Sequence, residues 1–221
     1  MSKNLVIMFV KEPRAGFVKT RLASVLGDER TVALYHSFIE DLIQTLSSLD
    51  YDLKLCISGS LEVVNKSFGD YDNFLQVEGD LGTRMKSAFE VQFEEGYEKV
   101  ILIGSDTPHI SKEIFDLTMT KLSTNEIVIG PSLDGGYYLI AFNHTTFNKE
   151  VFEEISWSTS SVLEQTLQKL HTKEVYLTMN LNDIDTFEDL KQFFNEYSQN
   201  DFKNSKTVSF LKENLSWKNM M

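Results

Sequence analysis

Short apolar runs alternate along this sequence with longer segments in which apolar residues recur every three or four positions. Residues 5–10 and 100–103 are unbroken apolar runs, the pattern of strands buried on both faces of a sheet. From Tyr35 to Leu46 the apolar residues instead recur with helical spacing. Strands that alternate with helices predict a mostly parallel sheet with helices on both of its faces.

The same two patterns predict further elements. The predicted strands cover residues 5–10, 53–58, 100–103, 127–129, 137–142 and about 175–177. The predicted helices cover residues 35–46, 81–96, 111–117, 161–170 and 186–197. Ser111 is a candidate N-cap, and Ser161 with Glu164 has the spacing of a capping box. Thr186 with Asp189 has the same type of start signal, so three helix starts are marked in the second half of the chain.

The organisation of the chain favours one domain. Its 221 residues contain no repeat, no low-complexity segment and no linker rich in Gly, Ser and Pro, and a chain of this length can bury a sizeable core. We assign residues 1–198 to this domain. Residues 199–221 are polar with scattered apolar side chains such as Trp217. We expect them to form a short helical extension packed on the domain or on the second subunit of a homodimer.

Composition and charge narrow the class of protein. With 42% hydrophobic residues, the chain is globular rather than disordered. Its formal net charge of −12 opposes binding to a nucleic acid polymer, whose phosphates need Lys and Arg. The single Cys56 rules out an intramolecular disulfide, and the longest apolar run, residues 5–10, is too short for a membrane span or a signal-peptide core. We therefore expect a cytoplasmic protein.

One segment departs from this acidic average. Residues 11–21 contain four basic side chains and one acidic side chain, a local net charge of +3. The segment follows the first predicted strand, and the ligands of parallel sheets bind beyond the carboxyl ends of the strands. Lys19, Arg21 and backbone amides, in a loop shaped by Pro13 and Gly16, can hold phosphates. A solvated basic turn is the alternative interpretation.

Two further loops carry candidate chemistry. Gly79 and Arg84 flank the start of a predicted helix, where glycine allows close approach of a ligand and arginine reaches a phosphate or a base. A plain loop-to-helix junction has the same composition. Asp106 follows the buried run 100–103 and is placed either to hold Mg²⁺ or to fix the turn before Pro108.

Acidic and aromatic residues later in the chain are equally open to two interpretations. Asp134 and the two glycines that follow it form either a simple hairpin turn or a pocket wall that contacts a hydroxylated substrate. Asp183 and Asp185 suit a second metal contact, or Asp183 hydrogen-bonds its own turn. Trp157, just before a predicted helix, is similarly ambiguous.

In their order along the chain, six blocks resemble one bacterial family. The blocks are Lys-x-Pro-x-x-Gly-x-x-Lys-Thr-Arg-Leu at 11–22, Gly-Asp-Leu-Gly-x-Arg-Met at 79–85, Gly-Ser-Asp-x-Pro at 104–108, Asp-Gly-Gly-Tyr at 134–137, Trp-Ser-Thr at 157–159 and Asp-Ile-Asp-Thr at 183–186. Over residues 4–197 the chain resembles glycosyltransferase-like proteins of the nucleotide-diphospho-sugar transferase superfamily, of the arsenosugar biosynthesis glycosyltransferase and selenodomain-associated transferase types. It is more distantly similar to the molybdenum cofactor and 2-phospho-lactate guanylyltransferases. The resemblance implies a three-layer glycosyltransferase-A fold, a Rossmann-like α/β fold that holds a nucleotide at its first loop.

The resemblance also implies roles for individual residues. Asp106 and Asp185 would hold Mg²⁺ or Mn²⁺, and together with Lys19 they would be the catalytic residues. Contacts to the nucleotide and its phosphates are implied for Pro13, Arg14, Gly16, Lys19, Arg21, Gly79 and Arg84. Contacts to the sugar or to the acceptor are implied for Asp134, Gly135, Gly136, Tyr137 and Trp157.

Two reactions are compatible with this resemblance. The leading hypothesis is a Mg²⁺-dependent glycosyltransferase that uses a nucleotide-diphospho-sugar and a small-molecule acceptor. Asp106 is a lone carboxylate, however, whereas most metal-dependent glycosyltransferases of this fold use Asp-x-Asp. The alternative is therefore a nucleotidyltransferase that joins a nucleoside triphosphate to a phosphorylated acceptor and releases pyrophosphate. A nucleotide-binding module without catalysis is a third interpretation, disfavoured because Lys19, Asp106 and Asp185 are all present.

Overall fold

A computed structural model describes residues 3–215, and a seven-stranded sheet forms its centre. The strands are β1 (Asn4–Lys11), β2 (Asp52–Ser58), β3 (Asn73–Leu75), β4 (Lys99–Ile103), β5 (Ile127–Pro131), β6 (Tyr137–Asn143) and β7 (Val175–Leu177). Their order across the sheet is β3-β2-β1-β4-β6-β5-β7. β6 is antiparallel to β4 and β5, and every other pairing is parallel. The mostly parallel sheet predicted from the sequence is confirmed.

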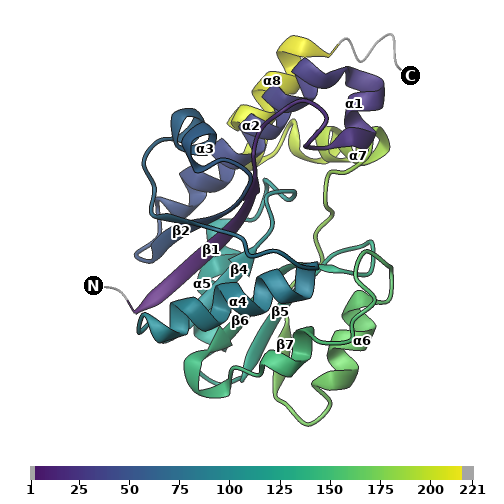
Figure 1. The fold of residues 1–221 in the computed structure, drawn as a ribbon. Coiled ribbons are helices and arrows are strands. Elements are labelled where there is room, and N and C mark those ends of the chain that lie inside the picture. The colour runs from purple at the N-terminus through teal and green to yellow at the C-terminus, as the bar shows by residue number, and fades with distance from the viewer. Residues whose placement is uncertain (1–2, 216–221) are drawn as a thin grey trace.

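Helices cover both faces of this sheet (Figure 1). They are α1 (Thr20–Leu26), α2 (Asp28–Leu46), α3 (Leu61–Phe68), α4 (Leu81–Glu94), α5 (Lys112–Lys121), α6 (Val162–Lys169), α7 (Phe187–Tyr197) and α8 (Lys206–Asn214). Three short 3₁₀ turns complete the described elements: η1 (His144–Thr146), η2 (Lys149–Phe152) and η3 (Asp201–Asn204).

Alternation along the strands divides the core into two clusters. Successive side chains of a strand point to opposite faces. In β1, Val6 and Met8 therefore join the cluster formed with α2, α5, α7 and α8, whereas Leu5 and Ile7 join the cluster formed with α4 and the segment around α6. The resulting arrangement of helices, sheet and helices confirms the predicted three-layer fold.

The helix caps predicted from the sequence can be compared with those in the structure. Thr186 caps α7 as predicted: its hydroxyl accepts from the backbone N–H of Asp189 at 3.2 Å, and the Asp189 carboxylate accepts from the Thr186 N–H at 2.7 Å. The capping box predicted at Ser161 is wrong. Ser161 has φ −100° and ψ 3°, outside the extended conformation of a capping residue, and its hydroxyl accepts from the Gln165 amide instead. Ser111 precedes α5 without a side-chain capping bond.

The described part of the C-terminal segment folds back onto the domain. In Figure 1, α8 lies beside α2 near the C-terminus, and Val208 and Leu211 are fully buried in the core shared with α2. The Asp41 carboxylate of α2 accepts from the backbone N–H groups of Lys206 and Thr207 at 2.7 and 2.8 Å. Trp217, which we expected to pack in this extension, lies outside the described residues. Within residues 3–215 no helix combines the length and the apolar character that a membrane crossing requires.

The order of the strands creates a crevice between β1 and β4. From β1 the chain moves outward to β2 and β3, and it then returns to β4 on the other side of β1. Ligands of open α/β sheets bind at such a switch point, beyond the carboxyl ends of the strands. The loops that follow β1 and β4 meet there, and they carry Lys19 and Asp106.

Candidate active site

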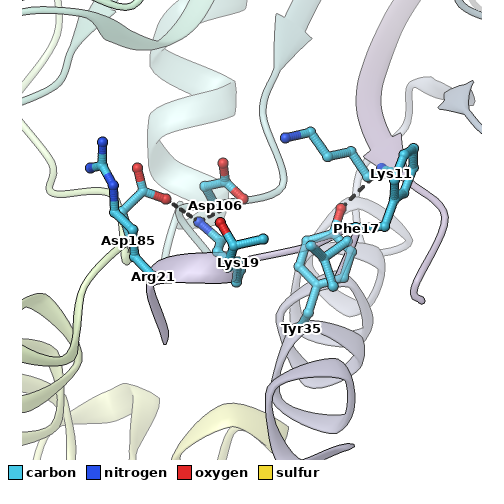
Figure 2. Close-up of a pocket in the computed structure, with 9 residues that line it drawn as sticks. Lys11, Phe17, Lys19, Arg21, Tyr35, Asp106 and Asp185 are labelled. Carbon is cyan, nitrogen blue, oxygen red and sulfur yellow. Dashed lines mark hydrogen bonds and ion pairs between the residues drawn. The ribbon is translucent and has the colours of Figure 1, made fainter. Parts of the chain in front are cut away.

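A pocket of about 180 Å³ lies at this switch point (Figure 2). The residues that line it are Lys11, Phe17, Val18, Lys19, Thr20, Arg21, Tyr35, Asp106 and Asp185. Pockets that enclose a whole small molecule usually have about 300–1,000 Å³. The space beside Lys19 is therefore smaller than a pocket that encloses a whole small molecule.

Lys19 is the centre of the pocket. Its Nζ lies 2.9 Å from Asp106 Oδ1 and 2.6 Å from Asp185 Oδ1. The lysine side chain is only 5% exposed, whereas those of the two aspartates are 42% and 46% exposed. The ammonium is thus enclosed, and both carboxylates remain accessible from the pocket.

Charge pairing fixes the protonation state of this group. Burial alone would lower the pKa of Lys19, but the charges of Asp106 and Asp185 outweigh it and hold the pKa above its usual range. Burial alone would raise the pKa of Asp185, yet the Lys19 ammonium keeps the pKa of that carboxyl below its ordinary value. Lys19 and Asp185 are therefore an ammonium and a carboxylate at neutral pH.

The backbone of Lys19 is held in an unusual conformation. Lys19 is the N-cap residue of α1 and has φ 47° and ψ 47°, in the left-handed region. This region costs a non-glycine residue about 1–2 kcal/mol. Its side chain caps no backbone group and instead makes the two ion pairs, so local strain accompanies the placement of the ammonium at the site.

Tyr35 of α2 joins the ends of β1 and β4. Its hydroxyl accepts from the backbone N–H of Lys11 at 3.0 Å and shares a hydrogen bond of 2.8 Å with the hydroxyl of Ser105. Burial, with a smaller contribution from the charge of Asp106, raises the pKa of Tyr35 to about 12, so the phenol stays protonated. Tyr35 belongs to the apolar stripe of its helix, which is why the sequence indicates only a core residue there.

A second set of contacts brings Asp185 to Asp106. The backbone N–H of Ile184 donates to the Asp106 carbonyl at 2.9 Å, and the Thr107 hydroxyl donates to Asp183 Oδ1 at 2.6 Å. Burial, with a further contribution from the charge of Asp106, raises the pKa of Asp183 to about 6. Asp183 therefore holds the loop after β4 through Thr107 rather than only its own turn. No local sequence pattern predicts this contact.

Of the first-loop residues expected at the nucleotide, Lys19 and Arg21 line this pocket, whereas Pro13, Arg14 and Gly16 do not. Arg21 lines it and extends beside Asp185 (Figure 2), and the Arg21 charge contributes to the lowered pKa of Asp185. Pro13 and Gly16 lie in the loop between β1 and Lys19, where Gly16 has φ 72°. Arg14 is exposed: its Nε lies 3.0 Å from Glu12 Oε1, and its guanidinium stacks over the Phe17 ring at 4.8 Å.

Gly79 and Arg84 do not line the pocket. Arg84 Nη1 donates to Gln76 Oε1 at 3.3 Å, and its Nε donates to the Asp80 carbonyl at 3.2 Å. Gly79 precedes Asp80, whose carboxylate caps α4. The structure thus places both residues at the junction between β3 and α4 and engages Arg84 with its own loop.

The Asp134 turn is a hairpin between β5 and β6, packed against the segment before α6. Asp134 Oδ1 accepts from the Gly136 N–H at 2.9 Å. Gly135 has φ +90°, and a Cβ atom there would lie 2.1 Å from the Ser160 carbonyl oxygen, so close packing alone requires this glycine. The charge of Asp134 contributes to the raised pKa of Asp183, which puts the turn within electrostatic reach of the Asp106 loop.

Tyr137 and Trp157, expected at the sugar or the acceptor, do not line the pocket. Both rings pack against the apolar cluster beneath α4. The hydroxyl of Tyr137 is buried beside Thr166 of α6. The indole of Trp157 lies against Gly82 of α4, where a Cβ atom would come within 2.7 Å of its Nε1. In this structure both residues support the layer of α4 and α6.

The carboxylate pair fits a divalent cation that takes few protein ligands. Mg²⁺ usually keeps several waters and is bound by one or two carboxylates together with substrate phosphates. Asp106 and Asp185 supply two accessible carboxylates that converge on one point. No group of three or more His, Cys, Asp or Glu side chains in residues 3–215 is arranged to hold a metal, so a metal here would depend on the donor phosphates for further ligands.

Two solved structures are similar to this chain. A candidate nucleotide-diphospho-sugar transferase from Desulfovibrio desulfuricans G20 is 36% identical, and the match covers 97% of this chain and 96% of that one with a TM-score of 0.94. The 4-diphosphocytidyl-2C-methyl-D-erythritol synthase of Anaerococcus prevotii shares the fold, with a TM-score of 0.57 at 14% identity over 90% of this chain and 100% of that one. Fold and site thus define a transferase-like enzyme.

A match to a protein family model assigns the family of this chain. Residues 42–159 match the family of uncharacterized proteins conserved in bacteria known as DUF2064, and the chain belongs to this family. The 2-phospho-L-lactate guanylyltransferase of Methanocaldococcus jannaschii is a more distant relative, 27% identical over 80% of this chain and 77% of its own length.

Proposed function

We propose that this protein is a divalent-metal-dependent transferase that acts on a nucleotide-linked phosphate, with glycosyl transfer from a nucleotide-diphospho-sugar to a small-molecule acceptor as its leading reaction. The observation that carries this proposal is the convergence of Lys19, Asp106 and Asp185 at the switch point between β1 and β4. The likeness to the D. desulfuricans protein over nearly the whole chain supports glycosyl transfer.

The pocket residues suit the charge changes of such a reaction. When the acceptor displaces a nucleoside diphosphate from the anomeric carbon, negative charge grows on the departing phosphate, and only groups that contact this charge in the transition state accelerate the step. Lys19 and Arg21 line the pocket and supply positive charge to offset this negative charge. Asp106 and Asp185 would hold the metal, which adds Lewis-acid stabilisation of the departing group. Tyr35 keeps the Asp106 loop at the end of β1.

Nucleotidyl transfer is a second candidate, favoured by two specific observations. Asp106 is a lone carboxylate whose partner Asp185 comes from a distant segment, an arrangement more typical of nucleotidyltransferases. The relative from M. jannaschii is a guanylyltransferase. In this reaction an acceptor phosphate attacks the α-phosphate of a nucleoside triphosphate, and Lys19 and Arg21 offset the charge of the pentavalent centre and of the departing pyrophosphate.

The test is a panel of nucleoside triphosphates and nucleotide-diphospho-sugars with MgCl₂, with and without hydroxylated and phosphorylated acceptors. Products are identified by mass spectrometry. Release of a nucleoside diphosphate with a new glycoside supports the leading reaction, and release of pyrophosphate supports the second. A chain that binds and converts none of these donors contradicts the proposal.

Two variants test the assigned residues. Lys19→Ala removes a positive charge proposed to contact the departing phosphate, and Asp106→Asn removes a proposed metal ligand. In each variant kcat should fall about 100-fold or more, the usual cost of losing one group that stabilises charge in the transition state. Glu213→Ala, which removes an exposed carboxylate of α8, is the matched control and should retain full activity. Full turnover in either pocket variant would refute the role of that residue.

A further inference from the structure

Lys19 stands where the carboxylate pair would bind a metal ion. Its Nζ contacts the Oδ1 atoms of both Asp106 and Asp185. A divalent cation bound by the same two oxygen atoms would overlap the ammonium, so ion and ammonium compete for one place. The competition is strong because the lysine side chain is 5% exposed and its charge has two anionic partners.

We infer that Lys19 is a tethered counter-ion of the Asp106–Asp185 pair, and that the pair accepts a divalent cation only together with a diphosphate or triphosphate group. This inference rests on the proposed function and specifies the form in which the donor enters. The phosphate group is required because it offers the displaced ammonium a new anionic partner. The binding unit is thus the metal–polyphosphate complex rather than the metal alone.

Electrostatics disfavour the metal alone. A buried charge that loses its partner is strongly destabilising, and a divalent cation on the pair would leave the Lys19 ammonium without one. Lys11 and Arg21 line the same pocket as Lys19, Asp106 and Asp185. A free metal ion would therefore meet three basic side chains and only two carboxylates. A polyphosphate brings the negative charge that offsets both the metal and these side chains.

The same exchange works in reverse when the product leaves. Once the nucleoside diphosphate or pyrophosphate had left with the metal, the two carboxylates would be free and Lys19 would pair with them again. The empty site is then neutralised by a side chain of the protein itself and needs no solution ion to remain stable.

The first experiment measures binding of Mn²⁺ alone, by the electron paramagnetic resonance signal of the free ion. Lys19→Met leaves the carboxylates without their counter-ion, so it should bind Mn²⁺ at least about tenfold more tightly than the wild type, a difference of roughly 1.4 kcal/mol. Lys3→Met is the matched control: it removes the same charge at the amino end of β1, where Lys3 pairs with Glu98, and should leave Mn²⁺ affinity unchanged. Adding Asp185→Asn to Lys19→Met should abolish the gain.

The second experiment uses pyrophosphate, which has no base or sugar. The wild type should bind the Mn²⁺–pyrophosphate complex at least about tenfold more tightly than Mn²⁺ alone, and Lys19→Met should lose most of this preference. Equal affinity of wild type and Lys19→Met for Mn²⁺ alone overturns the inference, as does a wild type without preference for the complex.

A second variant guards against misfolding. Lys19 has a left-handed backbone, which Asn adopts more readily than most residues, so Lys19→Asn should fold and give the same gain in Mn²⁺ affinity. The outcomes also separate the two proposals. A gain in Mn²⁺ affinity without turnover of any nucleotide donor refutes the proposed function alone, whereas turnover without this gain refutes the counter-ion role alone.

Discussion

Lys19 and His109 are both buried basic side chains, but only Lys19 has anionic partners. Lys19 lies between two carboxylates and keeps its charge. His109 is 8% exposed and packs against the rings of Phe193 and Tyr197, with centroids 5.4 and 4.6 Å away. Burial without an anionic partner lowers the pKa of His109 to about 4. At the residue scale, the presence or absence of paired anions thus decides whether a buried base stays charged.

The lowered pKa of His109 predicts how the stability of the fold changes with pH. Its pKa is about 4 in the folded state against an ordinary 6.5, so between these values the unfolded chain binds more protons. Stability should therefore fall as the pH decreases from about 6.5 to about 4, by up to about 3 kcal/mol from this residue. Urea unfolding over this range measures it.

The control for this prediction is His109→Phe, which retains an aromatic ring and cannot titrate. The loss of stability between pH 6.5 and 4 should be smaller in this variant by the His109 contribution. Parallel curves for the two proteins would show that His109 has an unperturbed pKa.

Individual site residues were predictable to different degrees. Asp106 and Asp185 follow from blocks that the chain shares with its superfamily, and the structure brings them together. The ion pairs of Lys19 with these two carboxylates were not predicted, and its expected contact with phosphates stays a prediction. Sequence alone gives no distance between side chains so far apart in the chain. Tyr35 was missed because its spacing is that of the buried stripe of α2.

Helix ends connect distant parts of this molecule. The start of α8 is held by Ser205, whose hydroxyl accepts from the Val208 N–H at 3.0 Å, and by Asp41 of α2, whose carboxylate accepts from two further N–H groups. Asp41 is 3% exposed. At the scale of elements, a buried carboxylate of one helix thus satisfies the first free amides of another.

Removal of the Asp41 carboxylate should loosen α8. Asp41→Ala leaves the buried N–H of Thr207 and the partly buried N–H of Lys206 without an acceptor. Hydrogen bonds to charged groups contribute about 1.5–3 kcal/mol each, so we expect a loss of at least about 2 kcal/mol in urea unfolding. Hydrogen exchange of the Lys206 and Thr207 amides should accelerate. Glu213→Ala, an exposed change on α8 itself, should alter stability by less than about 0.5 kcal/mol. Equal effects of the two variants would contradict the capping role.

The elements missed from the sequence are short or lack a start signal. α1 has seven residues and begins after Lys19, which is not a typical N-cap. β3 has three residues at the edge of the sheet and buries little of its surface. α3 has eight residues, and its cap Ser60 was not recognised. Long periodic segments and unbroken apolar runs were predicted because burial itself produces their pattern, whereas these elements owe their shape mainly to contacts with the rest of the fold.

Charge is distributed unevenly over the whole molecule. The chain has a net charge of −12, yet residues 11–21, from the end of β1 to the start of α1, have a local charge of +3. Lys11, Lys19 and Arg21 of this segment line the pocket together with two carboxylates. A small polyanion at this pocket would therefore meet a local excess of basic side chains on a molecule whose net charge is negative.

Ligand binding should stabilise the whole fold. A nucleotide donor at about 100 times its Kd, with Mg²⁺, adds about 2.7 kcal/mol to the free energy of unfolding. For a domain of this size we expect the Tm to rise by about 5–11 °C, measured by differential scanning calorimetry. Asp106→Asn should reduce this rise at the same donor concentration. An identical rise in wild type and Asp106→Asn would place the donor elsewhere on the molecule.

The two residues of the Lys19–Asp185 ion pair are synthesised at very different times, so the pocket forms late during synthesis of the chain. The chain leaves the ribosome from its N-terminus, so Lys19 emerges long before Asp185 completes the pocket. Closing contacts between such distant residues is slow, because the entropy of the long intervening loop must be lost first. A nascent chain that has not yet released the segment before α7 therefore lacks Asp185 and has no complete pocket. The proposed nucleotide donor and metal would thus stabilise only chains in which this segment has been released.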